Sequence, residues 1–333
     1  MLSRPSICQV LESKKFLGVS MNLFICMTPL QAVVANKIIS YESLSRDSCA
    51  LIYIANSDNE INRHYFSKLS SGMSSSEYIT SGRTLKTIHR LKDLLAGDRC
   101  DAYIASVDDS LVHYALSFVR LGRLTTFDDG TANIMPHSTY FHGVKRPFIR
   151  GLVLSAFHFV HGKKYSLESI KSRSDLHYTI YKNTKNAMGE SVYLNAFDIE
   201  PEGKSGGEIS LFLGGVYNEL ATNPADHENL KSQVMSFVNS IDNCRYIPHP
   251  RCKDYSNNAC DKLISEEVIM SLLNDFDVVR VYGFGSSAQF NLCSNARIIQ
   301  IPVISSLLKE DVVKTCEELG RLSGNHTVSI NGE

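Results

Sequence analysis

Two adjacent acids followed by a glycine stand in the run Phe127–Thr131, directly after an expected strand at residues 124–127. Ligands of open α/β sheets bind beyond the carboxyl ends of the strands. A carboxylate of Asp128 or Asp129 at that place could act as a general base, and the pair could also bind a metal ion. Because Asp-Asp-Gly is common in ordinary turns, a purely structural role stays open at this point.

A histidine stands between two prolines in the run Pro248–Arg251, after an expected strand at residues 245–247. The two prolines fix the backbone on either side of His249. A histidine presented rigidly, with Arg251 two residues on, suits an anionic leaving group. A lone histidine is often structural, so both interpretations are kept.

A glycine-rich turn, Gly283–Ala288, follows the expected strand at residues 278–282. Such a turn offers free N–H groups, two serine hydroxyls and the positive end of a helix, which together suit a phosphate group. It is neither a P-loop, because no lysine follows, nor a full GxGxxG, because Ala288 holds the third glycine position. A plain strand-to-helix turn with a serine cap is the alternative.

Short apolar runs alternate with helical patterns along the chain, which predicts parallel sheets covered by helices on both faces. We expect polar, helical segments between the second strand and about residue 95. A linker at residues 201–207 separates two Rossmann-like domains, at 21–200 and 208–333, that face each other across a cleft. Residues 1–20 are expected to be a loose extension, with Met21 as a possible natural start. The expected strands are residues 22–26, 50–55, 102–105, 124–127, 209–213, 245–247, 278–282 and 296–301.

Composition excludes several classes of protein. The 333 residues carry 34 Lys plus Arg against 35 Asp plus Glu, a net charge of −1, whereas a generic nucleic-acid binder is usually basic. Nine scattered cysteines without a CxxC favour free thiols in a reducing cytoplasm over disulfides or zinc. No apolar run is long enough for a transmembrane helix.

Residues 145–185 stand apart in charge. They hold nine basic and two acidic residues, a local net of +7, around the apolar run Pro147–Val160. The run is either a core helix with solvated basic flanks or a surface that meets an anionic membrane or glycolipid.

Five motifs in this order resemble the bacterial lipooligosaccharide sialyltransferases, family 52 of the glycosyltransferases. The resemblance covers most of residues 21–290, and its Asp-Asp-Gly, His-Pro and Ser-Ser elements recur in other bacterial sialyltransferase families. The motifs are Met21–Gln31, Phe127–Asn133, Ser174–Lys182, Pro248–Arg251 and Phe284–Ala288.

The resemblance implies an α/β protein of GT-B architecture that transfers sialic acid from CMP-sialic acid, with inversion and without a metal or other cofactor. The acceptor would be a terminal galactose, in α-2,3 linkage, of lipooligosaccharide or a related surface glycan. The implied location is the bacterial cytoplasm, peripheral to the inner membrane through residues 145–185. Members of the family tend to dimerise, which implies a homodimer, and no nucleic-acid partner is expected.

The same resemblance implies roles for individual residues. A protonated His249, the hydroxyls of Ser286 and Ser287 and a helix N-terminus would neutralise the departing phosphate of CMP. Glu266 would hold the ribose. The remaining donor-side residues would be Gly214, Gly215, Pro250, Arg251 and Gly285, and the acceptor side would be Asp129, Gly130 and Thr131.

The general base is the least direct of these assignments. Related families use the first acid of Asp-Asp-Gly, which points to Asp128. Some members of this family use an aspartate just after the Leu-Gly strand end, where this chain has Tyr217 and Asn218. Glu219, one or two positions later, is therefore the second choice.

Three alternatives remain open from the sequence. A relative could use another nucleotide sugar, such as a glucosyl or acetylhexosaminyl donor, although the Ser-Ser pair suits a leaving group with one phosphate. The loss of the acid at Tyr217–Asn218 would also fit a non-catalytic nucleotide-binding or glycan-binding relative. A peripheral membrane scaffold that uses residues 147–160 is the third.

Overall fold

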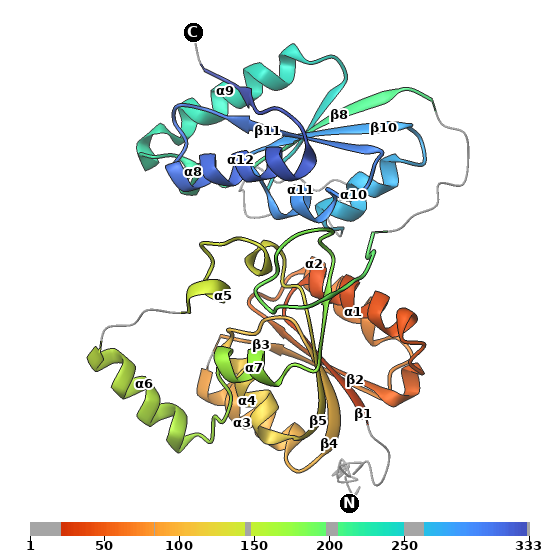
Figure 1. Ribbon diagram of the computed structural model, residues 1–333, viewed down its shortest axis with the longest axis vertical. Coiled ribbons are helices and arrows are strands. Elements are labelled where there is room, and N and C mark those ends of the chain that lie inside the picture. The colour runs from red at the N-terminus through yellow and green to blue at the C-terminus, as the bar shows by residue number, and fades with distance from the viewer. Residues whose placement is uncertain (1–20, 83, 144–147, 198–205, 250–262, 332–333) are drawn as a thin grey trace, which may run out of the picture.

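The computed structural model describes residues 21–331 except 83, 144–147, 198–205 and 250–262. Each of two domains is built around one parallel sheet, and the domains are stacked along the long axis of the molecule (Figure 1). The expected extension at residues 1–20 and most of the expected linker at 201–207 lie outside the described residues.

The N-terminal sheet has seven strands in the order β3-β2-β1-β4-β5-β6-β7, and every neighbouring pair is parallel. Its strands are β1 (Met21–Cys26), β2 (Cys49–Ala55), β3 (Ser75–Thr80), β4 (Arg99–Ile104), β5 (Arg120–Phe127), β6 (Leu176–Thr179) and β7 (Val192–Tyr193). The first two strands are buried almost throughout, which explains why their sequences are continuous apolar runs.

Helices cover both faces of this sheet. Buried side chains of α1 and α2 pack on one face, and those of α3, α4 and α7 pack on the other. The α-helices are α1 (Pro29–Tyr41), α2 (Glu60–Ser70), α3 (Thr84–Leu95), α4 (Ser110–Phe118), α5 (Thr139–His142), α6 (Phe148–Val160) and α7 (Leu167–Arg173), with short 3₁₀ turns η1 (Arg46–Ser48) and η2 (Thr131–Asn133).

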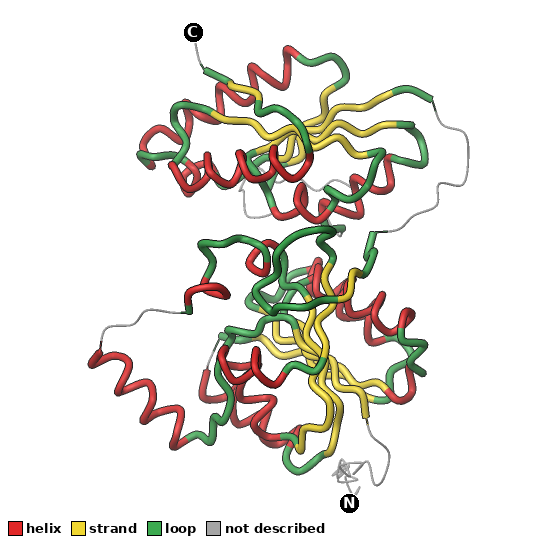
Figure 2. The backbone as a smooth tube through the Cα atoms, viewed as in Figure 1, coloured by secondary structure: helices red, strands yellow, loops and turns green. Residues whose placement is uncertain are grey.

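The C-terminal sheet has five parallel strands in the order β12-β11-β10-β8-β9, again between helices (Figure 2). Its strands are β8 (Glu208–Leu213), β9 (Cys244–Ile247), β10 (Val278–Gly283), β11 (Ile298–Ile304) and β12 (Val328–Ser329). Its helices are α8 (Tyr217–Leu220), η3 (Pro224–Asp226), α9 (His227–Ser240), α10 (Ser265–Leu272), α11 (Ser287–Asn291) and α12 (Glu310–Ser323).

The first turn of α1 shows how the local sequence builds these elements. Thr28 caps the helix by accepting a hydrogen bond from the Gln31 N–H, and Pro29 occupies the first helical position, where no N–H is needed. The helix therefore begins directly behind β1. This brings Thr28, Pro29 and Gln31 to the carboxyl edge of the sheet.

One expectation about the N-terminal domain is wrong. Residues 75–80 form the strand β3, where the sequence had suggested only polar helical segments. β3 is the edge strand of the sheet and only Ile79 is fully buried, so its sequence lacks the apolar run that marks the central strands.

The expected architecture of two Rossmann-like domains with parallel sheets facing across a cleft, the GT-B arrangement, is confirmed. In the N-terminal sheet the strand order reverses between β1 and β4, and in the C-terminal sheet it reverses between β8 and β10. Ligands bind at such switch points, beyond the carboxyl ends of the strands. No helix among the described residues is long and apolar enough to cross a membrane.

Candidate functional site

A cavity of about 400 Å³ lies between the two domains. The N-terminal domain contributes Thr28, Pro29 and Leu30 from the start of α1 and Asn59, Ile61 and Asn62 from the start of α2. The C-terminal domain contributes the ends of β8 and β9 and the starts of α10 and α11. Five residues that the sequence assigns to the donor side line this cavity together, namely Gly214, His249, Glu266, Ser286 and Ser287.

His249 lines the cavity and follows Pro248 in the chain, just after the end of β9. The backbone there is tied to β8, because the Gly214 N–H donates to the Ile247 carbonyl at 2.8 Å. A Cβ on residue 214 would lie 2.3 Å from the Tyr246 hydroxyl oxygen. Glycine at 214 therefore lets the chain pass the Tyr246 ring and keeps the end of β8 beside His249.

The glycine-rich turn after β10 is closed by a side chain that the sequence did not single out. The Gln289 Oε1 accepts hydrogen bonds from the N–H groups of Gly285, at 3.1 Å, and Ser286, at 3.2 Å. The prediction of free backbone donors is therefore wrong for these two groups. Gln289 is fully buried, and its Nε2 donates to the Val281 carbonyl.

What the turn offers to the cavity is its two hydroxyls. Ser286 caps α11 and Ser287 is the first residue of that helix, and both line the cavity. Gly285 has a φ of +68°, and a Cβ there would lie 2.9 Å from Thr315 Cγ2. Glycine is thus required for the turn that presents the serines.

Glu266 lies in the first turn of α10, and burial raises the pKa of its carboxyl. Its Oε1 accepts a hydrogen bond of 2.7 Å from the Asn291 Nδ2. The Asn291 Oδ1 in turn accepts 2.6 Å from the Tyr181 hydroxyl. Tyr181 belongs to the N-terminal domain, so this chain of hydrogen bonds ties Glu266 to the opposite side of the cleft.

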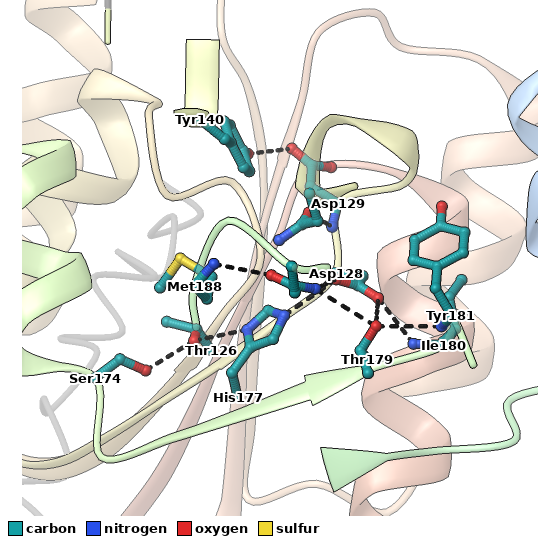
Figure 3. Close-up of polar contacts among 12 residues, drawn as sticks. Thr126, Asp128, Asp129, Tyr140, Ser174, His177, Thr179, Ile180, Tyr181 and Met188 are labelled. Atoms are coloured by element: carbon teal, nitrogen blue, oxygen red, sulfur yellow. Dashed lines mark hydrogen bonds and ion pairs between the residues drawn. The ribbon is translucent and has the colours of Figure 1, made fainter. Parts of the chain in front are cut away.

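Asp128 is fully buried at the end of β5, and both of its carboxylate oxygens are saturated (Figure 3). Its Oδ1 accepts from the His177 Nε2 and the Asn186 Nδ2, both at 3.0 Å. Its Oδ2 accepts from the Thr179 hydroxyl at 2.6 Å and the Ile180 N–H at 2.8 Å. In this arrangement Asp128 holds the segment after β6 against β5 and has no lone pair left for a substrate.

Asp129 points the other way and is partly exposed (Figure 3). Its Oδ1 accepts from the Gln31 Nε2, and its Oδ2 accepts from the hydroxyls of Ser106, at 3.0 Å, and Tyr140, at 3.1 Å. Burial raises the pKa of this carboxyl to about 6, even though the three hydrogen bonds oppose the shift. The shift brings the titration of Asp129 close to neutral pH.

The rest of the acceptor-side motif shapes the loop around Asp129. Gly130 has a φ of +82°, and Thr131 begins the short turn η2. The Asn133 Oδ1 accepts from the Asp129 N–H at 2.9 Å, which fixes the backbone of the acid. A Cβ on residue 130 would lie 3.7 Å from Leu30 Cδ2, so this loop lies directly behind a residue that lines the cavity.

The other predicted residues fall elsewhere. Tyr217 is buried and pairs with the Tyr246 hydroxyl at 2.9 Å, while Asn218 and Glu219 are exposed on α8 and do not line the cavity. Gly215 follows Gly214 in the chain and does not line the cavity. Pro250 and Arg251 lie outside the described residues.

The residues that sequence reasoning missed are the polar supports Ser106, Tyr140, Gln289 and Asn291. Ser106, Tyr140 and Asn291 are 11 to 25 residues away from the acids that they hold, so no local pattern marks them. Gln289 is local, because it completes a capping box with Ser286, and that spacing could have identified it. Gln31 stood only inside the opening motif Met21–Gln31, as part of its Leu-Gln pair, without a role. Together the site offers an imidazole and two hydroxyls from one domain. The other domain contributes a titratable carboxylate, Asp129, which does not line the cavity itself but belongs to the loop behind Leu30.

Comparisons with known proteins match most of the chain. The family model of Glycosyltransferase family 52 matches residues 46–306. A protein of Pasteurella multocida named CMP-N-acetylneuraminate:beta-galactoside alpha-2,3-sialyltransferase is 28% identical over 319 residues, which is 93% of this chain and 99% of the relative. An N-acetyllactosaminide alpha-2,3-sialyltransferase of Haemophilus influenzae is 29% identical and covers 84% of this chain and 90% of its own length.

Among solved structures, a sialyltransferase from Photobacterium damsela is similar to this chain with a TM-score of 0.48 and 11% sequence identity. The match covers 95% of this chain and 82% of that protein. This similarity is too weak to assign roles to residues of the site.

The saturated carboxylate leads to a prediction about stability. An Asp128→Asn substitution puts an amide NH₂ against two of the four donors, and we expect it to lower the free energy of unfolding by about 2–4 kcal/mol. Urea denaturation measures this. The matched control is Asp129→Asn. Its neighbours Ser106 and Tyr140 can rotate their hydroxyls to accept hydrogen bonds from the new amide, so the free energy of unfolding should fall by less than about 1 kcal/mol. Equal losses in the two variants would contradict the account of Asp128.

Proposed function

The chain belongs to glycosyltransferase family 52, and we propose that it is a sialyltransferase that moves sialic acid from CMP-sialic acid to a terminal galactose in α-2,3 linkage. The observation that carries this proposal is the convergence of His249, Ser286, Ser287 and Glu266 on one cavity between the domains. The names of the relatives from Pasteurella multocida and Haemophilus influenzae support the same donor and linkage.

The cavity suits a leaving group with a single phosphate. When the bond between the anomeric carbon and the phosphate oxygen breaks, CMP departs with new negative charge on that oxygen. We propose that His249 protonates or hydrogen-bonds this oxygen while Ser286 and Ser287 donate to the same phosphate. Because these groups can neutralise one phosphate, we propose that transfer needs no metal ion or other cofactor. Glu266 would hold the ribose, with its orientation set by Asn291.

The acceptor hydroxyl attacks the anomeric carbon from the opposite face, which inverts its configuration, and its proton must pass to a base. Asp128 was the first choice from the sequence, but all of its lone pairs are occupied. We propose that Asp129 takes the proton. Its carboxylate is partly exposed, its hydrogen bonds hold it in place, and a pKa of about 6 suits a base at neutral pH.

We further propose that the galactose is carried by a membrane glycolipid such as lipooligosaccharide. The enzyme would then work at the cytoplasmic face of the inner membrane, in peripheral contact through residues 145–185. The local charge of +7 in that segment supports attraction to an anionic surface.

A transfer assay with CMP-sialic acid and a fluorescent lactoside in the presence of EDTA tests the reaction. We expect wild-type protein to form the sialylated product and His249→Ala to lose about 10²–10⁴-fold in kcat, because the leaving oxygen is no longer protonated. His227→Ala is the matched control, since this histidine lies partly exposed at the start of α9, does not line the cavity and should leave activity unchanged when replaced.

Two outcomes would contradict the proposal in different ways. If wild-type protein is protected by CMP in a thermal melt but transfers nothing, the chain is a non-catalytic relative or uses another acceptor. If CMP gives no protection and a UDP-sugar does, the donor assignment is wrong.

The pH dependence tests the base. Asp129 accepts a proton only when ionised, so kcat/KM should fall as the pH drops through about 6 and be fully present above pH 7. We expect Asp129→Asn to lower kcat by about 10²–10⁴-fold and to remove this acidic limb, while its thermal melt stays close to wild type. Near wild-type activity in Asp129→Asn would exclude Asp129 as the base and return the role to Asp128 or Glu219.

A further inference from the structure

The helix α10 carries Glu266 in its first turn but lacks a side-chain cap of its own. Its N-cap residue is Ile264, and an isoleucine side chain has no atom that can accept a hydrogen bond. Glu267 stands at the third helical position, where the glutamate of a capping box would reach back to the N–H of the N-cap residue. In this chain the Ile264 N–H has a different partner.

That partner is a tyrosine of the opposite domain. The Tyr65 hydroxyl accepts a hydrogen bond from the Ile264 N–H at 2.9 Å and donates one to the Glu267 Oε2. A single hydroxyl from α2 thus stands between the two groups that a capping box would join directly. Tyr65 is only 1% exposed, so water does not take the place of its hydroxyl. In Figure 1, α2 lies at the edge of the N-terminal domain that faces α10.

Lys68, almost one turn further along α2, makes a second contact with the same glutamate. Its Nζ lies 2.8 Å from the Glu267 Oε1, but half of the lysine side chain is exposed. An ion pair of this kind contributes little, because water screens it. A backbone N–H that loses its acceptor at a domain interface is more costly. The Tyr65 hydroxyl is therefore the decisive contact between α2 and α10.

Glu266 is held at its backbone by this contact and at its side chain by another. Tyr65 binds residues 264 and 267, on either side of Glu266 in the chain. The Glu266 Oε1 accepts from Asn291, which in turn accepts from Tyr181. Both tyrosines belong to the N-terminal domain, whereas Glu266 belongs to the C-terminal one. The orientation of Glu266 in the cavity therefore depends on contact between the domains.

We propose that Tyr65 is a positioning residue for the donor nucleotide, because its hydroxyl holds the start of α10 and thereby orients Glu266 toward the ribose. This role rests on the proposed function, in which Glu266 accepts hydrogen bonds from the ribose hydroxyls. Tyr65 itself does not line the cavity. Recognition of the ribose then requires the two domains to be in contact.

The binding of two nucleotides to the full-length protein, measured by isothermal titration calorimetry, tests this role. One is CMP, and the other is dideoxy-CMP, which lacks both ribose hydroxyls. We expect wild-type protein to bind CMP at least about tenfold more tightly, because hydrogen bonds to a charged group are lost in the analogue. In Tyr65→Phe this ratio should fall below about threefold, through weaker binding of CMP alone.

Tyr103→Phe is the matched control. Tyr103 is also buried and its hydroxyl also donates to a glutamate, Glu42, at 2.6 Å. Both residues belong to the N-terminal domain and neither lines the cavity, so this variant should keep the wild-type ratio. In the transfer assay, Tyr65→Phe should raise the KM for CMP-sialic acid about tenfold and change kcat by less than about threefold, as expected when only binding is lost.

A second pair of variants keeps the test decisive if Tyr65→Phe does not fold. Glu267→Gln keeps an oxygen that can accept from the Tyr65 hydroxyl, whereas Glu267→Leu removes it. Only the leucine variant should therefore lower the ratio of the two affinities.

The possible failures are distinguishable. A wild-type ratio in Tyr65→Phe and Glu267→Leu, or equal losses for CMP and dideoxy-CMP, would overturn the proposal, because Tyr65 would then only stabilise the interface. Wild-type protein that binds both nucleotides equally would overturn the role of Glu266 and with it that of Tyr65. Wild-type protein that binds neither nucleotide would overturn the proposed function and this inference together.

Discussion

The buried carboxylate of Asp128 is the interaction on which the N-terminal half of the site depends. A charge without water must be met by donors, and four of them converge on it from His177, Thr179, Ile180 and Asn186. They all come from β6 and the segment after it, about fifty residues further along the chain. The pair of strands β5 and β6 is thereby locked at its carboxyl end. The side chain of the next residue, Asp129, is then directed away from this network.

The two adjacent acids have opposite environments and so divide two tasks. Asp128 has no exposed surface and four donors, which suits a structural anion. Asp129 is partly exposed and has side-chain donors whose hydroxyls can rotate, so it can exchange a proton without disturbing the fold. In the proposed reaction, a fixed charge beside a titratable one would let this short loop be both rigid and reactive.

In the C-terminal half of the site, glycines and one buried amide set the geometry. Glycines at 214 and 285 allow close approaches to Tyr246 and Thr315 that a Cβ would prevent. The Gln289 side chain accepts hydrogen bonds from two backbone N–H groups of the turn. Hydroxyls and an imidazole therefore face the cavity in place of these N–H groups. Tyr181 and Asn291 join this half to the other domain by a hydrogen bond beside Glu266. The two domains are thus joined beside Glu266, a residue that lines the cavity.

The sequence by itself determined the two parallel α/β domains, because central strands buried on both faces must be apolar runs. It also located the strand ends with Asp128, His249 and Ser286, since these motifs are local in the chain. It could not identify the edge strand β3, whose polar side chains face solvent. The acceptor of the Gly285 and Ser286 N–H groups, Gln289, is local in the chain and completes a capping box with Ser286. Only the tertiary structure decided which acid is enclosed, because the donors to Asp128 lie 49 to 58 residues further along the chain and no local pattern encodes these contacts.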